Sequence, residues 1–100
     1  MDFRSKSLDQ LFQAVLGLET LEDCYRFFED VCTIKELQDL SQRFQIAVLL
    51  DQGLNYQTIA KEVDTSSTTI SRVNTCLNYG SGGYRDAISR LKAMKEAQDA

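Results

Sequence analysis

The sequence predicts an all-α protein of about six helices, and three observations support this prediction. Proline, which breaks helices, is absent from the 100 residues. Segments rich in the helix-favouring residues Leu, Ala, Glu, Gln and Lys recur from residue 7 to residue 98. Within these segments apolar residues return every three or four positions, which is the spacing of one helix face. Because no linker rich in Pro, Gly or Ser interrupts the chain, residues 1–100 are expected to form one domain.

Two short amphipathic helices are expected first. One covers residues 7–17, where Ser7 is available to cap the first turn. Thr20 precedes the second helix, and Glu22 and Asp23 suit the positive end of its dipole. The apolar positions of the second helix are Leu21, Cys24, Tyr25, Phe28, Val31 and Cys32.

A longer third helix is predicted over residues 34–52. Thr33 and Glu36 have the spacing of a capping box, and Gly53 suits the left-handed residue that ends a helix. The main apolar stripe consists of Ile34, Leu37, Leu40, Phe44, Ala47 and Val48. Three more apolar positions widen this stripe beyond what one small monomer would cover: Ile46, Leu49 and Leu50. Residues 7–52 are therefore expected to supply dimerisation helices.

A helix-turn-helix is predicted over residues 55–78. Asn55 and Ser66 are suitable caps for two short helices, 56–63 and 67–77. Ala60 is small enough for the close crossing of the two helices, and Asp64 in the turn tolerates the left-handed backbone region. The other residues expected to pack the seam are Ile59, Val63, Ile70, Val73 and Leu77.

A C-terminal helix is expected over residues 84–96, after the glycine-rich stretch "NYGSGGY". Its inward positions are predicted to be Tyr84, Ala87, Ile88, Leu91 and Met94. Its other face is basic and carries Arg85, Arg90, Lys92 and Lys95.

Hydroxyl side chains crowd the start of the second helix of the predicted helix-turn-helix. Short hydroxyls can bond base edges or phosphates, and the unpaired amides of a helix N-terminus attract phosphate oxygens. The polar residues upstream, on the first of the two helices, could reach the DNA backbone. A well-capped turn in a helical hairpin would also explain the hydroxyls. The candidate DNA-binding residues are Gln57, Thr58, Lys61, Ser66, Ser67, Thr68, Thr69, Ser71 and Arg72.

The formal net charge of −4 argues against a strongly basic nucleic-acid protein. The acidic excess lies upstream, however, because residues 1–50 contain five Lys and Arg against nine Asp and Glu, whereas residues 51–100 contain six of each. The local field at a binding face matters more than the total charge. We therefore expect a modest DNA affinity that depends strongly on salt.

Several other classes of protein find little support in the sequence. Histidine, the commonest general base and metal ligand, is absent, so neither an enzyme nor a metal site is expected. Glu36 and Asp39 on one helix face are better explained as solvated, and Cys24 and Cys32 as core residues. With Cys76, the cysteines number three and form no complete disulfide framework, which favours a reduced, cytoplasmic protein. The longest aliphatic run, residues 46–50, is far shorter than the roughly 20 residues needed to span a bilayer, so no membrane span is expected. A helical protein–protein interaction module is the main alternative to DNA binding.

The residues from Thr33 to Tyr79, "TIKELQDLSQRFQIAVLLDQGLNYQTIAKEVDTSSTTISRVNTCLNY", resemble the Trp repressor superfamily and are most similar to its YerC/YecD-like branch. The upstream stretch "DCYRFFEDVCT" extends the resemblance to most of residues 8–84. The resemblance implies an intertwined, all-helical homodimer whose two recognition helices bind successive major grooves of double-stranded DNA. Repression by blocking polymerase is the mechanism implied by analogy.

The resemblance also implies a possible effector pocket. Arg43 and Arg72 match the two arginines that hold the corepressor in the tryptophan-responsive member. Val73 stands where that member has a glycine that leaves room for the indole, and Cys76 stands where it has a hydroxyl residue. Tryptophan is therefore not the expected ligand. No cofactor is expected to be required, and the small molecule that would occupy the pocket is left open.

Overall fold

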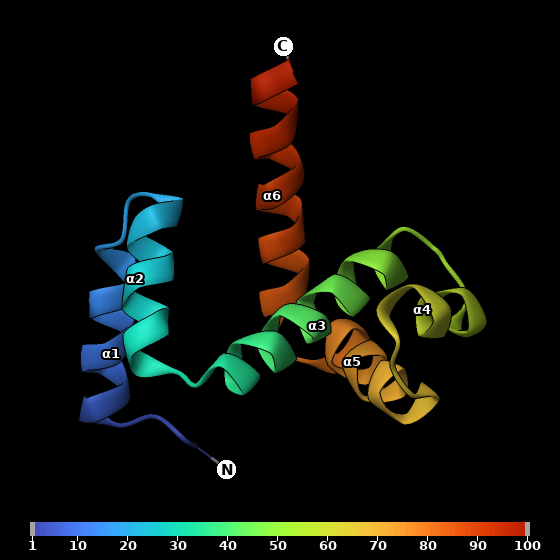
Figure 1. Ribbon diagram of the computed structural model, residues 1–100, viewed down its shortest axis with the longest axis horizontal. Helices are drawn as coiled ribbons and strands as arrows, with labels where there is room; N and C mark the ends of the chain where they lie inside the picture. Colours follow the sequence, from blue (N-terminus) through green and yellow to red (C-terminus); the bar gives the residue numbers. More distant parts are fainter. Residues whose placement is uncertain (1, 100) are drawn as a thin grey trace. The chain divides into compact units, whose positions relative to one another are not determined.

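The computed structural model describes residues 2–99, and within this range the regular structure consists of six helices and no strands (Figure 1). The predicted all-α class is therefore confirmed. The helices are α1 (Lys6–Leu16), α2 (Leu21–Val31), α3 (Ile34–Asp51), α4 (Tyr56–Val63), α5 (Ser67–Tyr79) and α6 (Gly83–Asp99). None of these described helices has both the length and the apolar character needed to cross a membrane.

The chain divides into two compact units, Met1–Leu37 and Gln38–Ala100. The division falls inside α3, so this helix begins in the first unit and continues through the second. The first unit contains α1 and α2, and the second contains most of α3 together with α4, α5 and α6.

The first unit consists of two capped helices that bury little of their apolar surface. Ser5, not Ser7 as predicted, caps α1, and its Oγ accepts a hydrogen bond of 3.1 Å from the Leu8 amide. The prediction failed because both serines precede the apolar repeat, and the extended backbone at Ser5 starts the helix one residue earlier than expected. Thr20, which precedes the predicted second helix, caps α2. No residue of α1 or α2 is fully buried within this chain.

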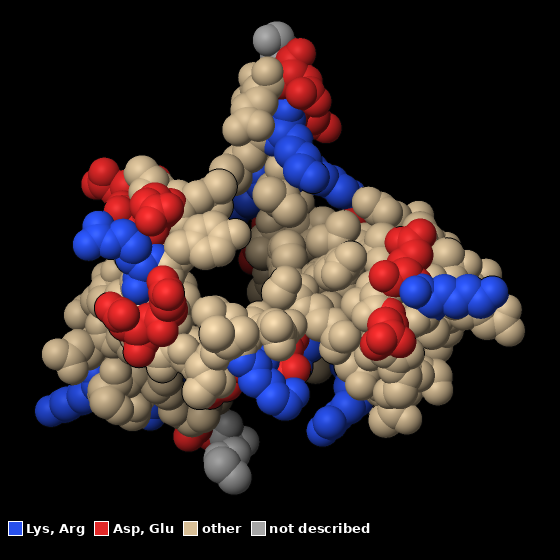
Figure 2. All heavy atoms as spheres, in the orientation of Figure 1, with Lys and Arg blue, Asp and Glu red and all other residues tan. Residues whose placement is uncertain are grey.

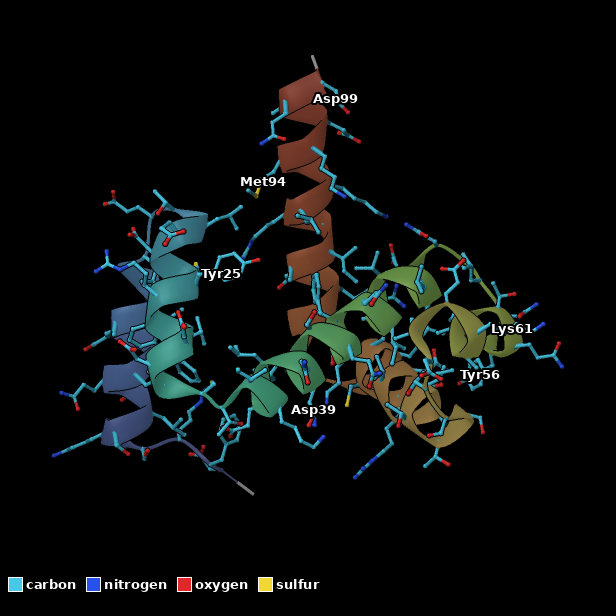
Figure 3. All side chains as sticks on the ribbon, viewed as in Figure 1. Tyr25, Asp39, Tyr56, Lys61, Met94 and Asp99 are labelled. Atoms are coloured by element: carbon cyan, nitrogen blue, oxygen red, sulfur yellow. The ribbon has the colours of Figure 1, made fainter. Side chains whose placement is uncertain are left out.

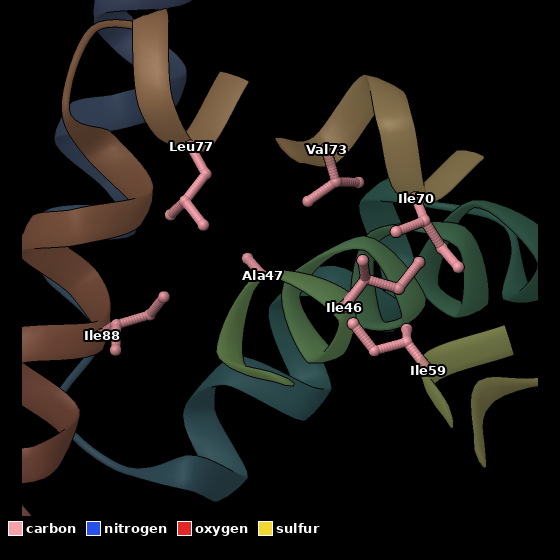
Figure 4. Close-up of a cluster of buried hydrophobic side chains, with 7 residues drawn as sticks. All are labelled: Ile46, Ala47, Ile59, Ile70, Val73, Leu77 and Ile88. Carbon is pink, nitrogen blue, oxygen red and sulfur yellow. The ribbon is translucent and has the colours of Figure 1, made fainter. Parts of the chain in front are cut away.

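The core of the second unit forms around the C-terminal half of α3 (Figure 4). Its buried residues are Ile46, Ala47, Ile59, Ile70, Val73, Leu77 and Ile88. Ile46, which we expected to widen the stripe towards a second subunit, is instead completely buried in its own chain. The reason is that α4, α5 and α6 all contribute buried residues to one cluster around α3, so more than one face of α3 is covered. Ile34 and Leu40, at the other end of the predicted stripe, are exposed.

The helix-turn-helix has the predicted caps and turn. The Asn55 side chain accepts a hydrogen bond of 2.9 Å from the Thr58 amide and starts α4. Asp64 ends α4 in the left-handed region, with φ of 52°. Helix α5 continues two residues beyond the predicted end and stops at Gly80, where a Cβ atom would lie only 2.3 Å from the Cys76 carbonyl oxygen. A glycine is therefore required to end α5 in this way.

Helix α6 is longer than predicted and packs mainly through its first half. Ile88 is buried, and the Tyr84 ring stacks on Phe44 of α3 with ring centroids 6.4 Å apart. Met94, which we predicted to face inward, is 60% exposed. The core cluster includes no residue of α6 beyond Ile88, so a favourable apolar spacing alone does not bury this end of the helix.

Candidate nucleic-acid interface and the adjoining pocket

The outward surface of α5 forms one wall of an open groove beside the start of α4. The groove has a volume of about 470 Å³. Four of the predicted DNA-binding residues line it, together with two residues that the sequence analysis did not select. The lining residues are Tyr56, Ser67, Thr68, Ser71, Arg72 and Thr75.

The two additional groove residues differ in how readily the sequence could have revealed them. Thr75 lies one helical turn after Ser71, and its hydroxyl donates to the Ser71 carbonyl at 3.0 Å, so helical spacing could have identified it. Tyr56 is the first residue of α4 (Figure 3). Its approach to α5 depends on the packing of the two helices, which the sequence pattern does not specify.

The predicted residues on α4 are exposed but do not line this groove. Gln57, Thr58 and Lys61 all lie on the solvent-facing side of α4, and Figure 3 marks Lys61 on that helix. Their side chains are available to a ligand that covers both α4 and α5. The groove therefore contains only part of the predicted DNA-binding set.

Ser66 and Thr69 are engaged in the cap of α5. The Ser66 Oγ accepts a hydrogen bond of 3.2 Å from the Thr69 amide and lies 3.1 Å from the Thr69 Oγ1. Thr69 is half-buried and lines a different pocket, on the α3 side of α5. The structure thus separates Thr69 from the hydroxyls of the groove.

The second pocket lies between α3 and α5 and is closed at one side by α6. Its volume is about 400 Å³. The four residues of the predicted effector pocket all line it, and so do four others. The complete lining is Asp39, Gln42, Arg43, Thr69, Arg72, Val73, Cys76 and Tyr84. Asp39 and Gln42 are within one turn of Arg43, so spacing could have found them, whereas Tyr84 comes from a separate helix.

Two side chains determine the character of this pocket. Val73 is only 4% exposed, because it also packs into the core. Burial raises the pKa of the Tyr84 hydroxyl above its ordinary value, and the nearby Cys76 sulfur raises it further, whereas Arg43 lowers it. Tyr84 is therefore a neutral hydrogen-bond donor at neutral pH. A ligand would meet this hydroxyl as well as two guanidinium groups.

Arg72 lines both the groove and the pocket. It lies on α5 immediately before the buried Val73 and is itself exposed. A side chain in this position can interact with a ligand on either side of the helix. It therefore links the two candidate binding sites physically.

The basic face of α6 is partly neutralised by α3, which the sequence did not predict. On the face shown in Figure 2, cationic side chains follow α6. Arg85 and Lys92 form ion pairs of 2.8 and 2.7 Å with Asp51 at the end of α3. The hydrogen bond from Lys92 is the main cause that lowers the pKa of Asp51, despite the opposing effect of burial. Two of the four basic side chains on α6 thus have an intramolecular partner.

No group of three or more His, Cys, Asp or Glu side chains within residues 2–99 is arranged to hold a metal ion. Cys24 and Cys32 are half-buried, Cys76 is exposed, and all three are free thiols. The polar groups that line the groove and the pocket are hydroxyl, amide and guanidinium groups, together with the Asp39 carboxylate and the Cys76 thiol.

The chain is a helix-turn-helix protein. The motif consists of the capped helix α4, the left-handed turn at Asp64 and helix α5, whose outer surface is exposed. The family described as Trp repressor protein matches residues 6–92. YerC of Bacillus subtilis (strain 168), an uncharacterized protein, is 52% identical over 89 residues, which are 89% of this chain and 86% of that protein. The chain therefore belongs to the Trp repressor family and is similar to its YerC-like branch, as the resemblance predicted.

Solved structures show the same similarity. A crystal structure from Staphylococcus aureus, of a protein proposed to be a Trp repressor, has 46% sequence identity and a TM-score of 0.85, and the match covers 89% of each chain. The crystal structure of a TrpR-like protein from Eubacterium eligens ATCC 27750 has 48% identity and a TM-score of 0.86, and the match covers 89% of this chain and 92% of that one. At these identities the similarity extends to the sequence as well as the fold.

Proposed function

We propose that the protein is a sequence-specific DNA-binding transcriptional regulator that acts as a repressor and reads the major groove with α5. The observation that carries the proposal is the groove beside α4, where α5 presents exposed hydroxyls and one arginine in a chain of the Trp repressor family. In a helix-turn-helix the second helix enters the major groove while the first crosses the DNA backbone. Helix α5 occupies the position of the second helix.

The groove chemistry supports this role. Ser67 and Thr68 lie in the first turn of α5, where amides without intrahelical partners can also bind a phosphate oxygen. Ser71 follows one turn later on the same side of the helix, and Arg72 adds a cation that can bind phosphate or a guanine edge. On α4, Gln57 and Lys61 are exposed and available to the flanking backbone.

We propose that the functional form is a homodimer. Helices α1 and α2 bury no residue fully, and they leave large apolar side chains in solvent, among them Leu16 (84% exposed), Leu21 (80%) and Tyr25 (72%). Exposed apolar surface of this extent is typical of a protein–protein interface. A two-fold dimer would present two α5 helices to half-sites about one helical turn of DNA apart.

A small molecule is proposed to regulate DNA binding from the pocket between α3 and α5. The two guanidinium groups of Arg43 and Arg72 outnumber the one carboxylate, Asp39, and the Tyr84 hydroxyl offers a hydrogen bond, which suits a small anionic ligand. Val73 lines the pocket at the position where the tryptophan-responsive member has a glycine, so we do not propose tryptophan. Because Arg72 lines both sites, a bound anion would alter the side chain that faces DNA.

Affinity selection of sheared genomic DNA, followed by sequencing of the retained fragments, tests the proposed function. The purified protein should enrich an inverted repeat at moderate salt, and Arg72→Ala should lose this enrichment. Arg90→Ala is the matched control, because Arg90 is an exposed arginine of α6 and lines neither the groove nor the pocket. In a titration against salt, Arg72→Ala should also reduce the slope of log affinity by about one unit if Arg72 neutralises one phosphate.

The alternative is a helical interaction module that uses its apolar surface to bind another protein. Partner binding of this kind would depend little on salt. If the wild-type protein retains no sequence above background at low and moderate salt, with and without added cell metabolites, the DNA-binding proposal fails and the interaction module replaces it.

A further inference from the structure

A polar network joins the C-terminal ends of α3 and α5 through α6. One nitrogen of the Arg85 guanidinium donates to Asp51 Oδ1 at 2.8 Å, and another donates to Asn78 Oδ1 at 2.9 Å. Lys92 donates to the other oxygen of Asp51 at 2.7 Å. The network therefore connects the consecutive helices α5 and α6 with the end of α3, which lies 34 residues before Arg85 in the sequence.

The network continues along the recognition helix. The Asn78 side-chain amide donates to the carbonyl oxygen of Asn74 at 3.0 Å and to its side-chain oxygen at 2.9 Å. Asn74 is one turn before Asn78, and it follows the groove residues Ser71 and Arg72 by three and two residues. Arg85 is thus linked to the part of α5 that leads into the groove.

Local preferences alone do not account for this arrangement. Asp51 is the last residue of α3, where the negative end of the helix dipole disfavours a carboxylate. Asp51 nevertheless accepts hydrogen bonds from two cations, and its side chain is only 16% exposed. A locally unfavourable residue that gains tertiary partners often has a positional role.

The residues that α5 buries in the core are all apolar. Helix α5 packs through Ile70, Val73 and Leu77, and apolar packing lacks the directionality of a hydrogen bond. The connection to α6 consists of Gly80, Ser81 and Gly82, in which two glycines allow many backbone angles. A planar guanidinium that binds two helices at once restricts the angle between them, and a lysine ammonium could not reproduce both contacts in one plane.

We infer that Arg85 is a positioning residue for DNA recognition, which holds α5 at the angle on α3 that places the groove residues against the bases. The inference rests on the proposed function. Arg85 belongs to α6 and contacts the C-terminal end of α5, far from the first turn of that helix. It therefore need not touch DNA. Sequence-specific contacts tolerate only small errors in position, of about 0.5 Å or 10–20°, whereas contacts to phosphate charge tolerate more.

The test compares Arg85→Lys with the wild type and with Arg90→Lys as a matched control on the same helix. Affinity is measured for the selected operator and for unrelated DNA across a range of salt concentrations. Arg85→Lys keeps the charge but loses the double contact, so its operator affinity should fall about three- to ten-fold, the size expected for one or two hydrogen bonds. Its affinity for unrelated DNA and its salt slope should not change, and Arg90→Lys should match the wild type.

Asn78→Ala breaks only the arm of the network that reaches α5, and it should reproduce the loss of operator preference. Combined with Arg85→Lys, it should cause little additional loss, because both changes remove the same connection. If Arg85→Lys and Asn78→Ala unfold at lower temperature but keep the wild-type ratio of operator to unrelated affinity, the network is merely structural and the inference is overturned. Arg85→Gln extends the test, since a salt slope reduced by about one unit would identify Arg85 as a phosphate contact instead.

The wild-type measurement separates the inference from the proposed function. A wild-type protein without preference for any sequence overturns the proposed function, and the positioning role falls with it. A wild-type protein with clear preference, accompanied by variants of equal preference, overturns the positioning role alone.

Discussion

Replacement of Ile59 by alanine should weaken the packing of α4 against the core and lower stability. Ile59 is completely buried and is the buried residue of this eight-residue helix. The change removes three carbon atoms, and at about 0.8 kcal/mol for each buried methylene or methyl group their transfer to water accounts for about 2.4 kcal/mol. A residual cavity adds to this loss, so the free energy of unfolding should fall by about 2.5–4.5 kcal/mol. Urea unfolding followed by circular dichroism at one fixed protein concentration measures the change.

Ile59→Val is the graded control for this prediction. It removes one carbon atom and should lower the free energy of unfolding by only about 0.5–1.5 kcal/mol. Both variants should unfold with the wild-type dependence on urea, because the surface exposed on unfolding hardly changes. A loss below about 1 kcal/mol for Ile59→Ala, with that dependence unchanged, would show that Ile59 does not carry the packing of α4, since a fully buried isoleucine cannot be truncated so cheaply.

Three further predictions concern the caps and charges. The pKa of Asp51 lies below its ordinary value of 3.8, so the stability that its carboxylate contributes is present above pH 3.8 and is lost as the pH falls through the folded pKa. Asp51→Asn should therefore lower the urea midpoint at pH 7. The difference in urea midpoint between this variant and the wild type should shrink towards pH 3. Ser66→Ala removes the cap of α5 and should lower stability by about 0.5–2 kcal/mol in thermal unfolding, whereas Ser89→Ala on the exposed surface of α6 should be neutral or slightly stabilising. Thr68→Glu should leave the melting temperature unchanged or slightly raised, because a carboxylate suits the first turn of a helix. It should weaken DNA binding by at least about tenfold in a fluorescence anisotropy titration. Undiminished binding would place α5 away from the phosphates.

Most helix boundaries could be predicted because their causes are local. The Thr33–Glu36 capping box forms with bonds of 2.8 and 3.1 Å, each between residues three positions apart. The Glu36 carboxylate accepts a hydrogen bond from the Thr33 amide, and this bond is the main cause that lowers the pKa of Glu36. Short-range hydrogen bonds of this kind can be predicted from the spacing of residues in the sequence. The prediction of Ser7 as the cap of the first helix was wrong, because the hydroxyl of Ser5 suits the same local pattern.

The groove residues were predictable from local spacing only where one helix supplies them, whereas the pocket residues Arg43, Arg72, Val73 and Cys76, from two helices, were predicted by the family resemblance. Ser67, Thr68, Ser71 and Arg72 share a surface because they are neighbours on α5. Whether these residues bind DNA stays a prediction. The sequence could not show that Tyr56 joins this surface, because that depends on the crossing of two helices.

The sequence by itself determined the helical class, most of the caps, the left-handed turn and the family. Each of these depends on residues a few positions apart or on the order of residues in the chain. Only the tertiary structure decided that Ile46 belongs to the core, that Tyr84 closes the pocket, and that Asp51 pairs with Arg85 and Lys92. The partners of Asp51 lie 34 and 41 residues away in the sequence. Contacts over such separations depend on how whole helices pack, and apolar spacing within one helix does not specify its neighbours.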